Sequence, residues 1–111
     1  MNFKQKELVL LPYPFTDQEG NKVRPAVIIS NDHFNIHSQE KIMIPITSVI
    51  KDEPYSIIIN QADLLSGNLQ KPSRIRCDKI FTINQYSIIM KFGKINDKTS
   101  NKILSEVKGT F

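Results

Sequence analysis

The side chains best suited to chemistry in this sequence are a few polar ones that adjoin apolar, strand-like segments: Arg24, Thr47, Ser48, Asp17 and Glu19. Arg24 comes directly before Pro25, and a proline pushes the residue before it towards an extended backbone. Arg24 is therefore expected in a β-like conformation at the start of a strand, where proline's missing N–H is tolerated. A guanidinium on such a rigid base can stabilise negative charge on phosphoryl oxygens through paired hydrogen bonds.

Other kinds of catalytic centre find little support. The two histidines, His33 and His37, are expected in an exposed loop, and a single cysteine adds no zinc-binding pattern. The glycines are isolated, so there is no glycine-rich phosphate loop, and no serine-hydrolase elbow appears. Cys77 alternates with Ile75, which predicts a small buried hydrophobe and not a nucleophile. We therefore set aside an ATP-using or serine-nucleophile enzyme and expect neither a metal nor a cofactor.

The elements that must position these residues are short strands. Apolar runs separated by turn-rich segments predict strands over residues 7–11, 26–30, 42–46, 55–59, 73–78 and 80–83, and a last strand, or short helix plus strand, over 88–95. Residues 31–39 are expected to be a connection with room for one helical turn, and residues 61–72 are expected to be a turn-rich connection. Four consecutive apolar residues, 8–11, predict burial on both faces, as in a small closed barrel. A helix is expected after Asn96, a good N-cap, so the fold class is mainly β, a curved antiparallel barrel with a C-terminal helix.

Length and composition fit one domain spanning residues 1–111. The hydrophobic share is 40% and the charged share 23%, which is ordinary for a globular protein. No apolar run approaches the ~20 residues that a membrane-spanning helix needs. The first six residues lack the apolar core of a signal peptide, so a cytoplasmic protein without a membrane partner is expected.

The positive charge is concentrated in one stretch. Residues 71–94 hold six basic residues and one acidic residue, although the whole chain carries only +4. Such a segment can form a basic face for a polyanionic partner. The alternative is a set of solvated strand edges, where lysines discourage edge-to-edge pairing.

The ordered set of motifs resembles the MazF/PemK family of toxins from toxin–antitoxin pairs. The motifs cover nearly the whole chain: Pro12-Tyr13-Pro14-Phe15-Thr16-Asp17, Gly20, Arg24-Pro25-Ala26, Ile44-Pro45-Ile46-Thr47-Ser48, Ser73, Asp78-Lys79-Ile80, Thr82-Ile83 and Phe92-Gly93-Lys94-Ile95. The resemblance implies an SH3-like barrel with a C-terminal helix and a homodimer. It also implies a sequence-selective, metal-independent endoribonuclease that cleaves single-stranded RNA and is silenced by a cognate antitoxin protein.

The same resemblance implies roles for particular residues. The arginine of the Arg-Pro motif and the hydroxyl that closes the third strand form the catalytic pair, here Arg24 and Thr47, with Ser48 as the next candidate for the hydroxyl. Some members of the family use a carboxylate from the first loop as the general base, and Glu19 is the candidate for this role here. The residues expected to contact RNA are Tyr13, Phe15, Thr16, Asp17, Lys22, Arg74 and Arg76.

Several alternatives remain open from the sequence. Arg24 could be a surface arginine that covers a barrel rim, and Thr47 could be a turn former at a strand end. The same fold also serves CcdB-like toxins that bind DNA gyrase without catalysis, and a plain nucleic-acid-binding module is a further possibility. The Arg24 and Thr47 pair favours the nuclease. The apolar residues expected at a dimer interface are Ile88, Ile89, Met90, Phe92, Leu104 and Phe111.

Overall fold

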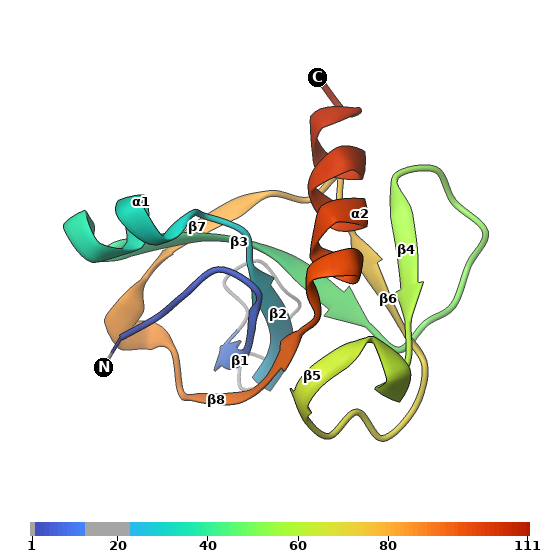
Figure 1. The fold of residues 1–111 in the computed structure, drawn as a ribbon, viewed down its shortest axis with the longest axis horizontal. Helices are drawn as coiled ribbons and strands as arrows, with labels where there is room; N and C mark the ends of the chain where they lie inside the picture. The colour runs from blue at the N-terminus through green and yellow to red at the C-terminus, as the bar shows by residue number, and fades with distance from the viewer. Residues whose placement is uncertain (1, 13–22) are drawn as a thin grey trace.

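A strongly curved antiparallel sheet forms most of the computed structural model, which describes residues 2–12 and 23–111 (Figure 1). Its strands are β1 (Glu7–Pro12), β2 (Val23–Ile28), β3 (Glu40–Thr47), β4 (Ser56–Ile59), β5 (Leu64–Gly67), β6 (Ser73–Arg76), β7 (Phe81–Asn84) and β8 (Met90–Ile95). The helices are α1 (Asp32–His37) and α2 (Asp97–Lys108), with 3-10 turns η1 (Gln61–Asp63) and η2 (Gln85–Ser87). None of the described helices is long and apolar enough to cross a membrane.

The sheet is an open half-barrel organised around β3. Hydrogen-bonded neighbours follow the order β4-β6-β3-β2-β1-β8-β5, and β7 pairs with the first half of β3. Within the described part of the chain no ladder joins β4 to β5, so the closed barrel expected from residues 8–11 is not formed. Those residues are nevertheless buried towards both faces, because a separate hydrophobic core covers each side of β1.

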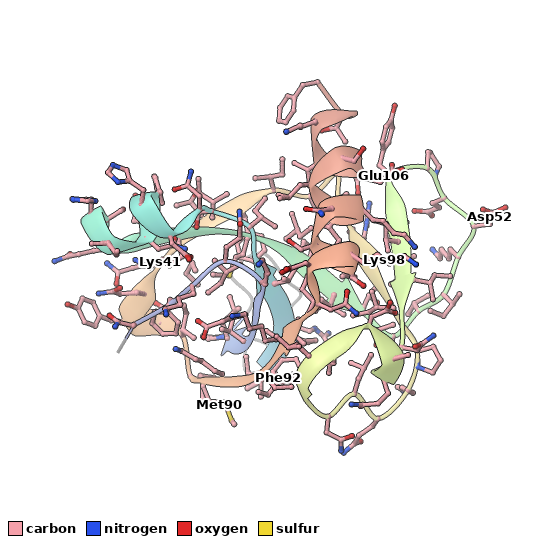
Figure 2. The ribbon with its side chains drawn as sticks, viewed as in Figure 1. Lys41, Asp52, Met90, Phe92, Lys98 and Glu106 are labelled. Atoms are coloured by element: carbon pink, nitrogen blue, oxygen red, sulfur yellow. The ribbon has the colours of Figure 1, made fainter. Side chains whose placement is uncertain are left out.

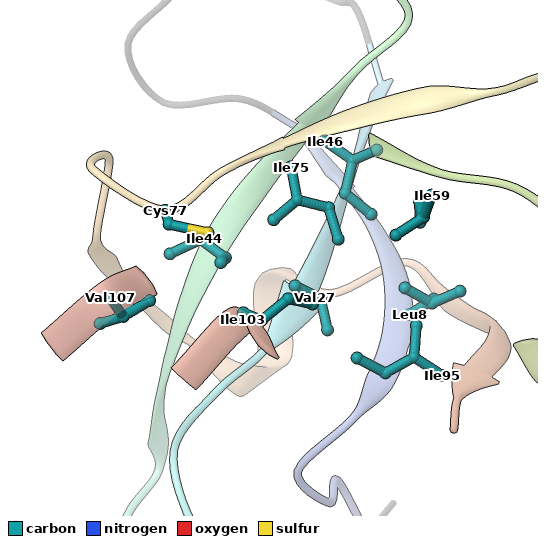
Figure 3. Packing of buried hydrophobic residues seen from close by; sticks show 10 residues of the cluster. All are labelled: Leu8, Val27, Ile44, Ile46, Ile59, Ile75, Cys77, Ile95, Ile103 and Val107. Carbon is teal, nitrogen blue, oxygen red and sulfur yellow. The ribbon is translucent and has the colours of Figure 1, made fainter. Parts of the chain in front are cut away.

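The first core, called the inner core, lies between the concave face of the sheet and α2. It contains Leu8, Val27, Ile44, Ile46, Ile59, Ile75, Cys77, Ile95, Ile103 and Val107 (Figure 3). Ile103 and Val107 of α2 face residues of β2, β3 and β6 there. The helix begins where predicted, because the Asn96 side chain accepts a hydrogen bond from the Thr99 N–H at 2.8 Å.

The second core, called the outer core, lies on the opposite face of β1, β2 and β3. It contains Phe3, Val9, Leu11, Ala26, Ile28, Met43, Phe81 and Ile88. Ile88 is only 8% exposed because its side chain belongs to this core, so it offers little surface to the expected dimer interface, which stays a prediction.

Two connections carry more structure than the sequence predicts. Residues 32–37 form a helix, α1, because the Asn31 side chain caps it and Asn35 is buried against Ser30. The one helical turn allowed for this connection is present, but the loop expected for the histidines is wrong: His33 and His37 lie one turn apart on α1, with ring centroids 4.5 Å apart. Residues 64–67, expected to be part of a turn-rich connection, form β5 against β8.

The β5–β8 pairing depends on two facing glycines. Gly67 has φ +91°, a conformation that favours glycine, and it is paired with Gly93. A Cβ atom on Gly67 would lie 2.2 Å from the Phe92 carbonyl oxygen, so a larger residue would push the two strands apart.

Candidate active site

Three polar residues from β2, β3 and β6, called the polar row here, line one pocket. Ala26 is paired with Pro45, the last pair of the β2–β3 ladder, and Arg24 and Thr47 lie two residues beyond this pair, one on each strand. Thr47 is itself paired with Arg74. Directly opposed residues of antiparallel strands share a face, with Cβ atoms about 4.5–5.5 Å apart. Sheet pairing therefore brings together side chains that are far apart in the sequence.

This row continues the face that carries the outer core. Alternation along β2 puts Arg24 on the same face as Ala26 and Ile28. Along β3 it puts Thr47 on the same face as Met43. The face is thus apolar at one end and polar at the other, and the packed apolar end gives the polar end a rigid base.

A pocket of about 950 Å³ lies over the polar end of this face. Five basic residues line it: Arg24, Lys71, Arg74, Arg76 and Lys79. Asp78 is the acidic residue that lines the pocket in the described part of the chain. Such an excess of positive charge in a concave site attracts an anion.

The Thr47 hydroxyl is held in place by the backbone that follows it. Its Oγ1 accepts a hydrogen bond from the Val49 N–H at 3.1 Å. A threonine hydroxyl can donate one hydrogen bond while it accepts others, so the Thr47 proton remains available to a ligand in the pocket. Ser48, the second candidate for this role, is exposed and also lines the pocket.

Arg76 and Asp78 form an ion pair in the same pocket. The Arg76 Nη2 donates to Asp78 Oδ2 at 3.1 Å. The Arg76 Nε is buried, and no acceptor among residues 2–12 and 23–111 pairs with it. A buried donor without a partner is costly, so this Nε is a source of local strain in the described structure. Asp78 was not among the predicted catalytic residues. Its alternation with Arg74 and Arg76 indicated that the three side chains share one face, and this signal could have identified it.

Arg74 is placed differently from Arg24 and Arg76. The residue is 3% exposed and its guanidinium makes three hydrogen bonds within the chain. Nε donates to the Val49 carbonyl oxygen, and Nη1 donates to Glu53 and to Ser56. Its expected contact with RNA stays a prediction, and the contacts seen are with the protein.

The basic stretch of residues 71–94 divides into two parts. Four of its six basic residues line the pocket: Lys71, Arg74, Arg76 and Lys79. Lys91, on β8, forms an ion pair with Glu7 at 3.1 Å and lies over the ring of Phe3. The concentration of positive charge in this stretch predicted a basic face. The pocket accounts for four of the six basic residues, and Lys91 lies elsewhere.

Other candidate residues lie elsewhere or outside the described part. Glu19, Tyr13, Phe15, Thr16, Asp17 and Lys22 are outside the described residues. The two histidines of α1 do not line the pocket. No group of three or more His, Cys, Asp or Glu side chains that could hold a metal ion occurs among the residues described.

Cys77 is buried in the inner core, as the sequence predicts. Burial, followed by the carboxylates of Glu106 and Asp78, raises the pKa of the Cys77 thiol to about 12. At neutral pH the side chain is therefore a protonated thiol, which is a poor nucleophile.

Comparison with known proteins identifies the family. The model of the PemK-like, MazF-like toxins of type II toxin–antitoxin systems matches residues 4–111. Because the match spans nearly the whole sequence, the chain belongs to this toxin family. A comparison with curated protein sequences gives no match.

Solved structures share the fold at low sequence identity. A mycobacterial endoribonuclease in complex with its cognate antitoxin is 19% identical, with a TM-score of 0.76 over 96% of this chain and 92% of that chain. The Mycobacterium tuberculosis toxin MazF-mt6 is 18% identical, with a TM-score of 0.76 over 95% of both chains. A MazE–MazF structure from Deinococcus radiodurans is 19% identical, with a TM-score of 0.75 over 98% of this chain and 95% of that chain. The MazF-like fold expected from the resemblance is thereby confirmed.

Proposed function

We propose that this toxin is a sequence-selective, metal-independent endoribonuclease that cleaves single-stranded RNA and is silenced by a cognate antitoxin. The observation that carries the proposal is the pocket that Arg24, Thr47 and Arg76 line together. Family membership supports it, and so do the neighbours named as endoribonucleases or solved with their antitoxin.

RNA supplies its own nucleophile, so the protein needs few functional groups. The 2′-hydroxyl 5′ to the scissile bond loses its proton and attacks phosphorus, and the bond to the leaving 5′-oxygen breaks. The products are a 2′,3′-cyclic phosphate on one fragment and a 5′-hydroxyl on the other. Arg24 and the exposed part of the Arg76 guanidinium would donate to the phosphoryl oxygens, whose negative charge grows in the transition state. The Thr47 hydroxyl would donate to the same group.

The proton transfers need a base and an acid. Asp78 is the carboxylate that the described part of the pocket provides, and its ion pair with Arg76 fixes its position. Glu19, the base predicted from the sequence, remains a second candidate. Either carboxylate would accept the 2′-hydroxyl proton as a general base. The leaving 5′-oxygen would take a proton from water or from the carboxylate that has just been protonated, and it leaves as the 5′-hydroxyl.

The proposal is tested by incubating the purified protein with a long transcribed RNA in the presence of EDTA. We expect endonucleolytic cuts at a small set of related sequences, with no loss of rate when divalent ions are chelated, because no step requires a metal. Adding a purified antitoxin encoded beside the toxin should stop the reaction. Intact RNA would contradict the proposal and would leave a gyrase-binding or RNA-binding toxin, which binding assays with each partner would then separate.

We further propose a homodimer. Ile89 and Met90 are 52% and 46% exposed, and Figure 2 shows the Met90 side chain pointing away from the body of the protein. Phe111, at the end of the chain, is 91% exposed. Phe92 is half-buried against the inner core, so it would contribute less area to the interface. A two-fold dimer would cover such side chains and extend the surface that holds RNA.

Light scattering at micromolar concentration measures this assembly. We expect a mass near twice the single-chain value of 12.8 kDa. Met90→Lys should shift the population towards monomers, because it places a charge in the proposed interface, whereas Lys98→Ala on the exposed face of α2 should not. A single-chain mass for a protein that still cleaves RNA would show that the monomer suffices.

A further inference from the structure

The loop that joins β3 to β4, residues 48–55 and called the β3–β4 loop here, forms one wall of the pocket. Ser48 and Val49 line the pocket at the start of this loop. Asp52 lies at its outer tip and points away from the sheet (Figure 2). The position of the first loop residues therefore sets the width of the pocket beside Thr47.

Both ends of the β3–β4 loop are tied to the sheet by backbone groups. At the start, the Val49 N–H donates to Thr47 Oγ1 at 3.1 Å. At the end, the Tyr55 carbonyl oxygen accepts a hydrogen bond from the Cys77 N–H at 2.9 Å. The backbone of Tyr55 is left-handed, with φ 59°, where the loop turns into β4. The residues between these two points need another attachment if the wall of the pocket is to be rigid.

Arg74 supplies that attachment from beneath the loop. Its Nε donates to the Val49 carbonyl oxygen at 3.1 Å. Its Nη1 donates to Glu53 Oε2 at 3.0 Å and to Ser56 Oγ at 3.1 Å. One guanidinium thus binds Val49 near the start of the loop, Glu53 near its end and Ser56 just after it.

Burial makes this arrangement more than a surface ion pair. The Arg74 side chain is 4% exposed, whereas that of Glu53 is 40% exposed. A buried charge without partners is strongly disfavoured, so Arg74 favours the loop conformation that supplies its acceptors. Because Thr47 is paired with Arg74 across β3 and β6, the anchor stands directly beside the proposed catalytic hydroxyl.

We propose that Arg74 is a positioning residue for RNA recognition: it holds the β3–β4 loop against β6 and so fixes the pocket wall formed by Ser48 and Val49. This inference rests on the proposed endoribonuclease function. It assigns Arg74 a role through the loop instead of through a direct phosphate contact. RNA binding and the choice of cleavage sequence depend on the contacts between Arg74 and the loop. The rate of the chemical step at Arg24 depends on them less.

The two roles of Arg74 predict opposite effects of Glu53→Ala. If Arg74 bound phosphate, removing Glu53 would release the guanidinium and also remove a repelling carboxylate, so RNA would bind more tightly. If Arg74 anchors the loop, removing Glu53 loosens the pocket wall, and RNA binds more weakly despite the lost negative charge. The sign of the change in KM therefore separates the two roles.

Hydrogen exchange tests the anchor without RNA. The reporters are the amides of Val49 and Cys77, whose hydrogen bonds tie the ends of the loop. We expect both to exchange at least ~10-fold faster in Arg74→Ala and Glu53→Ala, because local opening becomes easier. Arg74→Lys should fall between, since an ammonium cannot reproduce the fork of the guanidinium. Unchanged exchange in Glu53→Ala and Arg74→Lys would overturn the proposal, even if Arg74→Ala failed to fold.

Thr99→Ala is the matched control. The Thr99 hydroxyl is buried and donates to Asp63 Oδ1 at 3.0 Å, away from the loop and the pocket. This variant loses a buried hydrogen bond too, but we expect the Val49 and Cys77 amides to keep their wild-type exchange relative to global unfolding. It should also cleave RNA with wild-type KM.

Kinetics on a short RNA that carries one mapped cleavage site completes the test. For Arg74→Ala and Glu53→Ala we expect KM to rise ~10-fold while kcat changes less than ~3-fold, together with cuts at additional sequences. The salt dependence of binding should keep its slope in Arg74→Ala, whereas loss of a direct phosphate contact would reduce the slope by about 0.7. A lower KM in Glu53→Ala, or the reduced slope, would assign Arg74 to phosphate. If the wild type does not cut RNA, the proposed function fails, and the exchange experiment still decides whether Arg74 holds the loop.

Discussion

Replacing Arg24 by alanine is expected to lower kcat for RNA cleavage by ~100-fold or more while the protein stays folded. Arg24 is half-buried at the polar end of a face whose other end is the outer core, so its base on β2 is rigid. A fixed guanidinium stabilises the charge that develops on the phosphoryl oxygens, and an alanine offers nothing in its place. Single-turnover cleavage of one RNA substrate measures the loss of rate.

Arg24→Lys separates charge from geometry. It keeps the positive charge but loses the paired donors, so an intermediate rate is expected if the transition state needs a two-point contact. Circular dichroism and thermal unfolding should show both variants folded, because the side chain is not part of either hydrophobic core. Cleavage by Arg24→Ala within a few-fold of the wild-type rate would remove Arg24 from the mechanism.

Much of the fold was predictable because its signals are local. The N-cap at Asn96 and the apolar residues Ile103 and Val107 at helical spacing predicted α2. Apolar runs between turn-forming segments predicted seven of the described strands, with errors of up to three residues at their ends. Such patterns need only neighbours in the sequence, and the family resemblance then supplied the arrangement of these elements.

The parts that the sequence did not reveal depend on distant partners. The segment Leu64–Gly67 is too short to show a strand period, and it becomes β5 through its pairing with β8. The polar composition of residues 31–39 suggests a loop. The short helix α1 forms there because Asn35 is buried and hydrogen-bonded to Ser30. The apolar run of residues 8–11 predicted burial on both faces correctly, but two separate cores and not barrel closure provide it.

The site shows the same division. Residue types and the Arg24-Pro25 motif indicated which side chains to examine, but only the folded sheet shows that Arg24, Thr47 and Arg74 line one pocket. Alternation predicted that Arg74 and Arg76 share a face. It could not show that Arg74 is buried under the β3–β4 loop while the Nε of Arg76 lacks a partner among the described residues. Equal charges on one face thus have different roles because their depths and acceptors differ.

An RNA substrate with a single 2′-deoxy nucleotide 5′ to the scissile phosphate is expected to resist cleavage altogether. The described residues show no activated nucleophile that could replace the 2′-hydroxyl: the Cys77 thiol is buried with its pKa raised to about 12, and neither Thr47 nor Ser48 has a described basic side chain hydrogen-bonded to its hydroxyl. Removal of the substrate's own hydroxyl therefore removes the attacking atom, and stabilisation of the phosphate by arginine cannot compensate.

The matched control is the same RNA with the 2′-deoxy nucleotide placed 3′ to the scissile phosphate, which should be cut at nearly the rate of the unmodified RNA. The 5′ fragment should carry a 2′,3′-cyclic phosphate, seen as the loss of one water relative to a phosphate monoester in its mass spectrum. Cleavage of the 5′-deoxy substrate, or of an all-DNA strand, would mean that water or a protein group attacks phosphorus. Arg24 would then stabilise the phosphoryl group of a different reaction, one that also requires a base to activate water.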